Sequence, residues 1–210
     1  GGLDILINNA GSLVARRMLN EMEAEFWHKV MDINLTSMMF VTKAAAPYLG
    51  KNENETYGDT ILGNNLQNVL SGGAGADTLA GGGDDDTLDG GASNDTADYS
   101  RAITAISVDL GAGVAAIDGE GGSDTLISIE TVSGSAFDDT LIGGTSSDSL
   151  FGAAGDDILS GGALGNDTLD GGDDVDTADY SSLGVDITAS LSSNLASVDG
   201  TGGVDTFVDI

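Results

Sequence analysis

Apolar residues recur at a fixed interval along most of this 210-residue chain. From Gly63 the sequence divides into units of nine residues, GNNLQNVLS, GGAGADTLA, GGGDDDTLD and GGASNDTAD, and a degenerate unit, NETYGDTIL, precedes them. Glycine, alanine and polar residues fill most of the first seven positions of these units. The eighth position is apolar, and its occupants are Ile61, Leu70, Leu79, Leu88 and Ala97. This pattern predicts a turn followed by a very short strand, and such units must stack to bury their apolar side.

The same pattern returns in a second array, as GSAFDDTLI, GGTSSDSLF, GAAGDDILS, GGALGNDTLD (one residue longer) and GGDDVDTAD. A larger period overlies the small one, because DTADYS occurs at 95–100 and again 81 residues later. The spacers between and after the arrays alternate apolar and polar residues, which is typical of half-buried strands. We expect them to extend or cap the stack, with Tyr99 and Tyr180 covering coil ends.

The sixth position of each unit carries an aspartate or asparagine. Nine residues make about half a coil, so alternate units are expected on the same side of the stack. The predicted ladders are Asp59 with Asp77 and Asp95, Asn68 with Asp86, Asp139 with Asp157 and Asp176, and Asp148 with Asp167. Neighbouring strands lie about 4.8 Å apart. Two carboxylates at about 4 Å repel by roughly 4 kcal/mol at an effective dielectric near 20.

A divalent cation bound through oxygen would reverse the sign of this repulsion. Calcium fits such ladders best, because it accepts six to eight oxygen ligands with loose geometry, whereas magnesium keeps its waters. The sequence therefore predicts Ca²⁺ as the cofactor of the repeats.

The units GGAGADTLA and GGGDDDTLD resemble the RTX (hemolysin-type) calcium-binding nonapeptide, GGxGxDxUx, of secreted bacterial proteins. The resemblance implies a mainly β fold, a parallel β-roll or β-solenoid with calcium between adjacent turns, preceded here by a short N-terminal β-α segment. It also implies export through a type I secretion channel and folding outside the cell. Besides the sixth-position aspartates, it implies ligands from backbone oxygens near Gly73, Gly75, Gly82, Gly91, Gly144, Gly155, Gly162 and Gly172.

Several units depart from the motif, and weaker calcium sites are expected there. Asn68 supplies a neutral oxygen, and Ser93 and Ala153 replace glycines. Ala97 and Ala178 place small side chains at strand positions. A single Gly- and Asp-rich unit would be typical of a solvated turn or of disorder; two arrays in register favour a folded stack.

The first 51 residues have a different character. They hold five acidic and five basic residues, whereas the rest of the chain holds 30 acidic residues and Arg101 alone. Residues 3–7 predict a buried parallel strand. The stretch from Glu23 to Tyr48 predicts a helix that ends near Pro47 and Gly50.

The sequences LINNAG and EFWHKVMDINLTSMMFVTKAAAP resemble the middle of a short-chain dehydrogenase/reductase. By that resemblance Asn34 matches the active-site asparagine, as a vestige. The family's glycine-rich dinucleotide turn and its catalytic Ser and Tyr-x-x-x-Lys have no counterpart here, and no tyrosine has a lysine four residues on. We therefore expect no enzyme activity and no nicotinamide binding.

Charge and composition argue against several classes of function. A net charge of -29 argues against nucleic acid, because a phosphate backbone needs a basic surface. Cysteine is absent, and no apolar run approaches the roughly 20 residues of a membrane span. The chain opens in mid-motif and stops where a further repeat element is due, so we expect a fragment at both ends. The expected parts are a dehydrogenase-like segment (1–51), a first array (52–98), a spacer (99–133), a second array (134–179) and a truncated spacer (180–210).

The sequence thus predicts a secreted, extracellular calcium-binding β-roll that folds on binding calcium and has calcium ions as partners. An alternative is that it forms the calcium-binding part of a larger secreted enzyme of the alginate epimerase, protease or lipase type. An NAD(P)-dependent oxidoreductase is the third possibility. A calcium titration, the flanking sequence and a nicotinamide-binding assay distinguish the three.

Overall fold

A computed structural model describes residues 4–5, 17–18, 58–184, 186–190, 195–198 and 203–210. By its internal contacts the chain divides into two compact units, Gly1–Leu49 and Gly50–Ile210. The described part of the second unit is built of strands, turns and bends without a helix. The mainly β fold expected from the repeats is therefore confirmed.

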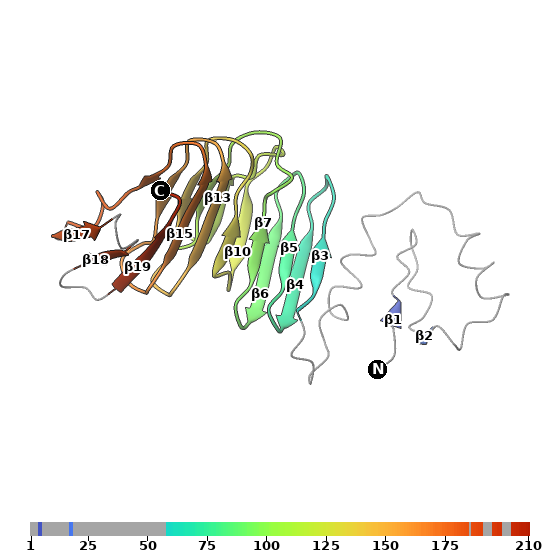
Figure 1. The fold of residues 1–210 in the computed structure, drawn as a ribbon. Coiled ribbons are helices and arrows are strands. Elements are labelled where there is room, and N and C mark those ends of the chain that lie inside the picture. Colours follow the sequence, from blue (N-terminus) through green and yellow to red (C-terminus); the bar gives the residue numbers. More distant parts are fainter. Residues whose placement is uncertain (1–3, 6–16, 19–57, 185, 191–194, 199–202) are drawn as a thin grey trace. The chain divides into compact units, whose positions relative to one another are not determined.

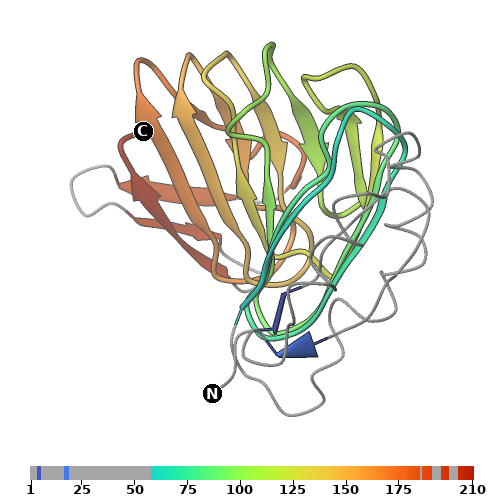
Figure 2. The same ribbon diagram turned by 90° about the vertical axis from the view of Figure 1, so that its right-hand side faces the viewer.

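Two sheets form the second unit, and Figures 1 and 2 show them as the two layers of one flattened coil. Among the described residues, the first sheet contains, in spatial order, β16 (Thr177–Ala178), β14 (Ile158–Ser160), β12 (Thr140–Ile142), β8 (Ser107–Asp109), β9 (Val114–Ile117), β10 (Asp124–Ile127), β6 (Thr87–Ala92) and β4 (Val69–Ala74). The second contains β17 (Ile187–Ser190), β18 (Leu195–Val198), β19 (Gly203–Val208), β15 (Thr168–Asp173), β13 (Ser149–Ala154), β11 (Thr131–Ser133), β7 (Thr96–Asp98), β5 (Thr78–Ala80) and β3 (Thr60–Leu62).

Two nine-residue units make one full coil, with one strand in each sheet. In the first array β3, β5 and β7 pair in parallel, with Thr60 opposite Thr78 and Thr78 opposite Thr96. On the other side β4 pairs in parallel with β6, with Leu70 opposite Leu88. Every partner lies 18 residues on, so the predicted stacking of alternate units is confirmed.

The interior of the roll is a row of eighth-position side chains. Leu79, Leu88, Leu141, Leu150 and Leu159 are all fully buried. Ala97 belongs to the same row, packed between coils in the strand β7. Because each unit contributes one such side chain, the core grows with the number of coils rather than with their width.

The first spacer continues the roll, but one of its strands runs against the others. Within it, β8 pairs in parallel with β12, and β10 pairs in parallel with β6. Between them β9 is antiparallel to both β8 and β10. The sheet is therefore mixed at this point, because short connections join β8, β9 and β10 and a parallel pair would need a long crossover.

The last segment ends the second sheet in the same manner. The strand β19 pairs in parallel with β15, with Leu169 opposite Phe207. Beyond it β18 is antiparallel to β19, and β17 is antiparallel to β18. The spacers thus extend the solenoid, and each adds antiparallel strands that the repeat pattern did not predict.

In the first unit the structure describes two short strands, β1 (Asp4–Ile5) and β2 (Arg17–Met18), which pair antiparallel. The prediction of a parallel strand at 3–7 is wrong for this pair, since strands separated by a short connection meet without a crossover. The expected helix from Glu23 to Tyr48 and the vestigial Asn34 lie outside the described residues.

Candidate calcium-binding site

The sixth-position carboxylates join the coils through one repeated hydrogen bond. In each case the carboxylate accepts the backbone N–H of the residue at the same position of the neighbouring coil. Asp77 Oδ1 accepts from Asp59 at 2.6 Å, and Asp95 Oδ1 accepts from Asp77 at 2.8 Å. In the second array Asp157 Oδ1 accepts from Asp139 at 2.7 Å. The remaining pairs within the arrays are Asn68 with Asp86, Asp148 with Asp167, and Asp157 with Asp176. The predicted ladders are therefore present.

The ladders also run through the spacers, which the sequence analysis did not assign. The backbone N–H of Asp86 donates to Asp124 at 3.0 Å, that of Asp95 to Glu130 at 3.0 Å, and that of Asp167 to Asp205 at 3.0 Å. The signal was present, because GEGGSDTLI at 119–127 and GTGGVDTFV at 200–208 are nonapeptides with an aspartate in sixth position.

The second oxygen of many of these carboxylates has no hydrogen-bond partner. Among the described residues six buried Oδ2 atoms are in this state, those of Asp77, Asp86, Asp95, Asp118, Asp157 and Asp176. All but Asp118 occupy the sixth position of a repeat unit. A buried carboxylate oxygen without a partner carries the full desolvation penalty, so each of these positions favours a cation.

Burial changes the acidity of the ladder carboxylates in the same direction. Desolvation, reinforced by the charges of Asp124 and Asp118, raises the pKa of Asp86 to about 7. Desolvation, with the charges of Asp139 and Asp176, raises the pKa of Asp157 to about 6. The ionised ladder is thus costly without a cation.

Glycine at the first position of the units makes room for the second carboxylate oxygen, Oδ2. A Cβ atom at Gly134 would lie 2.8 Å from Asp139 Oδ2 and 2.5 Å from the carbonyl oxygen of Gly152. A Cβ atom at Gly90 would lie 2.6 Å from Asp95 Oδ2. These first-position glycines were not among the predicted site residues, although their presence at the start of each unit from Gly63 on pointed to them.

The predicted ligand glycines lie in the turns, at the second and fourth positions. Seven of the eight have a positive φ: Gly73, Gly75, Gly82, Gly91, Gly155, Gly162 and Gly172. Gly144 is outside that group, and its N–H instead donates to Asp148 Oδ2 at 2.6 Å. In the same way the N–H of Ser135 donates to Asp139 Oδ2 at 2.6 Å. The Oδ2 atoms of Asp139 and Asp148 are therefore hydrogen-bonded within their own units.

Residues that replace glycine adopt the same backbone conformation. Ser93 has a φ of 96° and Ala153 a φ of 86°. Asp84 and Asp174, both at fourth positions, have φ values of 75° and 82°. The turn geometry is imposed by the stack, because these residue types rarely adopt positive φ on their own.

These features fit calcium. The repeated feature is a buried carboxylate oxygen without a partner, and calcium accepts carboxylate and backbone carbonyl oxygens. In the described part of the chain, no group of three or more His, Cys, Asp or Glu side chains could hold a metal ion. An ion in the turns would thus depend on backbone oxygens as well as on the ladder.

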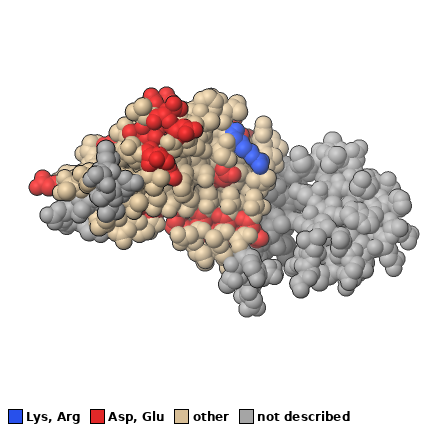
Figure 3. Space-filling model, viewed as in Figure 1, with Lys and Arg blue, Asp and Glu red and all other residues tan. Residues whose placement is uncertain are grey.

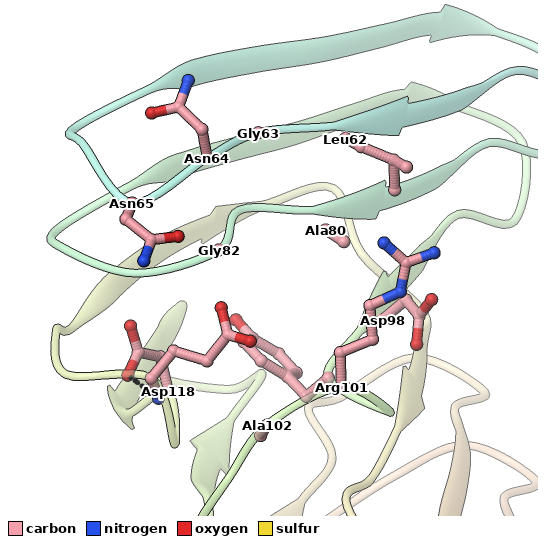
Figure 4. A pocket seen from close by; sticks show the side chains of 12 residues that line it. Leu62, Gly63, Asn64, Asn65, Ala80, Gly82, Asp98, Arg101, Ala102 and Asp118 are labelled. Atoms are coloured by element: carbon pink, nitrogen blue, oxygen red, sulfur yellow. Dashed lines mark hydrogen bonds between the residues drawn. The ribbon is translucent and has the colours of Figure 1, made fainter.

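Asp118 is not a sixth-position residue, and it lies beside a cavity of about 180 Å³ (Figure 4). Its Oδ1 accepts three backbone N–H groups, from Glu120, Gly121 and Gly122, at 2.7–2.9 Å. The cavity is also lined by Tyr99 and Arg101.

Figure 3 shows acidic side chains in a row and in a cluster on one face of the roll. Arg101 is the one basic residue after residue 51.

Comparison with known proteins gives different families for the N-terminal segment and for the repeats. Residues 1–59 match the short chain dehydrogenase family. Residues 58–97, 133–164 and 163–181 match the RTX calcium-binding nonapeptide repeat. Among the described residues no helix is long and apolar enough to cross a membrane.

The curated relatives match the first part of the chain. Short-chain dehydrogenase/reductase FrzI of Cladobotryum sp is 40% identical over 50 residues, which are 24% of this chain and 19% of that protein. Glucose 1-dehydrogenase 2 of Bacillus subtilis (strain 168) is 38% identical over 52 residues, 25% of this chain and 20% of that protein. The chain thus spans about a fifth of the length of these relatives.

The repeat matches coincide with the coils that carry the ladders, and RTX nonapeptide repeats bind Ca²⁺. Behind an N-terminal segment similar to part of a short-chain dehydrogenase, residues 58–97 and 133–181 of this chain are RTX calcium-binding nonapeptide repeats.

Proposed function

We propose that the chain is a non-catalytic, calcium-dependent folding module of a secreted protein. Its five sixth-position Oδ2 atoms that are buried without a partner carry this proposal, because they make the metal-free roll costly and the calcium-bound roll favourable. At low calcium the carboxylates repel one another and stay solvated in an extended chain. At extracellular calcium the ions supply the folding free energy.

The proposed ligands are the ladder carboxylates and the turn carbonyls. The carboxylates are those of Asp59, Asp77, Asp86, Asp95, Asp139, Asp148, Asp157, Asp167 and Asp176. The carbonyls belong to the turns at Gly73, Gly75, Gly82, Gly91, Gly144, Gly155, Gly162 and Gly172. Extracellular calcium modules bind with a Kd of roughly 10⁻⁴–10⁻³ M, and we expect affinities in this range.

Circular dichroism across a calcium titration tests the proposal on the whole 210-residue chain. We expect little strand signal after removal of calcium and a cooperative gain of strand signal as calcium rises. Magnesium at equal concentration is the control, and it should produce a much smaller gain because it dehydrates reluctantly. A full strand signal in chelator that calcium leaves unchanged would refute the proposal.

Secretion is a separate part of the proposal. The RTX repeats and the net charge of -29 support export as an unfolded chain through a type I channel, with folding outside the cell. Expression in a host with and without such a channel tests it. The chain should reach the medium only with the channel, and equal amounts in both media would contradict the proposed route.

A second candidate is that this chain is the calcium-binding part of a larger secreted enzyme. The segment that matches a short chain dehydrogenase favours a multidomain parent, because it shows the repeats joined to a sequence of another family. Dehydrogenase activity of the chain itself is tested by titrating NADH and NADPH and following nicotinamide fluorescence. No change is expected, and saturable binding would favour the oxidoreductase instead.

A further inference from the structure

The two spacer units differ from the array units in one contact. The hydroxyl of Tyr99 donates a hydrogen bond to Asp124 Oδ2 at 2.9 Å. The hydroxyl of Tyr180 donates to Asp205 Oδ2 at 2.6 Å. The tyrosine precedes its aspartate by 25 residues in both pairs. The same tyrosine–aspartate hydrogen bond therefore occurs in both spacers, at equivalent positions.

Asp124 and Asp205 occupy true ladder positions. The Oδ1 of Asp124 accepts the N–H of Asp86, and the strand after it is in register with β6, with Leu126 opposite Leu88. The Oδ1 of Asp205 accepts the N–H of Asp167, and β19 is in register with β15. By backbone and by Oδ1, these two residues are equivalent to the sixth-position aspartates of the arrays.

The second oxygen distinguishes them from the five array aspartates whose Oδ2 has no partner; in Asp139 and Asp148 this oxygen accepts a backbone N–H instead. In Asp77, Asp95 and Asp157 the Oδ2 atom is buried and has no hydrogen-bond partner. In Asp124 and Asp205 the corresponding atom receives a tyrosine hydroxyl. The tyrosine hydroxyl is therefore bonded to the Oδ2 atom that would bind a cation in the arrays.

The tyrosines are held firmly in these positions. Tyr99 is 6% exposed and belongs to the apolar core together with Ala102 and Ile106. Tyr180 packs edge-on against Phe207, with ring centroids 6.1 Å apart. A phenol ring packed on one side, with its hydroxyl on a buried carboxylate, blocks that oxygen without adding charge.

We propose that Tyr99 and Tyr180 act as seals, so that Asp124 and Asp205 continue the ladder without binding calcium. The inference rests on the proposed function, because it assigns which ladder carboxylates bind the ion and which do not. Each sealed aspartate keeps the coil spacing through its Oδ1 and ends a run of calcium sites. Loss of the hydroxyl would convert the sealed aspartate into a calcium ligand.

The test counts calcium ions bound by the whole chain. Wild type, Tyr99→Phe, Tyr180→Phe and the double variants Tyr99→Phe/Asp124→Asn and Tyr180→Phe/Asp205→Asn are compared by equilibrium dialysis at saturating calcium, with folding checked by circular dichroism. We expect each Phe variant to bind one more ion than wild type. Each double variant should return to the wild-type number, because asparagine removes the charge that the extra ion needs.

A second measurement serves if a variant folds only with calcium. The unfolding midpoint is followed against calcium concentration, and its slope reports the number of ions released on unfolding. A slope larger by one ion in the Phe variants supports the seal. Wild-type stoichiometry and slope in both Phe variants would overturn it, whereas a wild type that binds no calcium would instead overturn the proposed function.

Discussion

Asp139 and Asp157 lie one coil apart, and they are joined by a bond from backbone to side chain rather than by an ion pair. The N–H of Asp139 donates to Asp157 Oδ1 at 2.7 Å, and the N–H of Asp157 in turn donates to Asp176 Oδ1 at 3.0 Å. The carboxylates of Asp157 and Asp176 thus each have a structural oxygen, which spaces the coils, and a second oxygen without a hydrogen-bond partner. The two roles can be separated by substitution.

Asp157→Asn separates them, because an amide keeps an acceptor oxygen for the N–H of Asp139 and removes the charge. Without calcium we expect the variant to be at least as stable as wild type, since a buried unpaired charge is removed. With saturating calcium we expect it to be less stable by about 1–3 kcal/mol, because one ion loses a charged ligand. The strand signal that remains in chelator measures the first effect, and thermal unfolding in saturating calcium measures the second.

Asp173→Asn is the matched control, because Asp173 is exposed at the end of β15. It should leave unchanged both the strand signal in chelator and the unfolding midpoint in calcium. Equal destabilisation by Asp157→Asn with and without calcium would show that the carboxylate has a structural role only.

The pH dependence of the calcium-free roll should be opposite to that of most proteins. Burial raises the pKa of Asp86 and of Asp167 to about 7, against roughly 3.9 in an unfolded chain. Between these values the folded state binds more protons than the unfolded state, so the free energy of unfolding falls as pH rises. The stabilisation is fully present below about pH 4 and is lost as pH passes about 7.

Circular dichroism after exhaustive removal of calcium measures this dependence. The strand signal that remains should be larger at about pH 5 than at about pH 8. In saturating calcium the urea unfolding midpoint should instead be higher at about pH 8, because protons and calcium compete for the same oxygens. A calcium-free strand signal that rises from pH 5 to pH 8 would contradict the buried ladder.

Ala153→Gly should stabilise the roll. Ala153 adopts a φ of 86°, which costs an alanine roughly 1–2 kcal/mol and costs glycine nothing. Glycine also gains entropy in the unfolded chain, so we expect a net gain of about 0.5–1 kcal/mol. The adjacent Ala154→Gly is the control, and it should destabilise by about 0.5–1 kcal/mol because no strain is relieved there. Chemical unfolding in saturating calcium measures both, and a loss of stability in Ala153→Gly would contradict the strain.

Leu150→Ala should cost about 2–5 kcal/mol, because Leu150 is fully buried between Leu169 and Val132 in neighbouring coils. The exposed Leu164 gives the control, and Leu164→Ala should change stability by less than about 0.5 kcal/mol. The measurement is chemical unfolding in saturating calcium. Equal effects of the two substitutions would show that the eighth-position row is not the core.

The repeat period was enough to predict the stacking of alternate units, the apolar row and the ladders. A period of nine with an apolar eighth residue leaves few ways to bury Leu79 or Leu150, and stacking then brings Asp77 beside Asp95. The stacking, the apolar row and the ladders follow from the geometry of one repeat unit, and the sequence of the repeats is enough to predict it.

The spacers were less predictable, because their pairing depends on contacts far apart in the sequence. The short connections make β9 antiparallel to β8 and β10, but the pairing of β8 with β12 and of β10 with β6 joins residues far apart in the sequence. The bond from Tyr99 to Asp124 links residues whose approach is visible only once both coils are in place. The units around Asp124 and Asp205 could have been found by extending the same nine-residue alignment into the spacers.

The ladder has a direction. In each ladder bond between sixth positions, the N–H belongs to the earlier residue and the carboxylate to the later one, from Asp59 and Asp77 to Asp167 and Asp205. The N–H of a ladder residue is therefore bonded only once the following coil is in place. When the N-terminus emerges first, each coil waits for the coil after it, so the ladder is completed from its N-terminal end toward its C-terminal end.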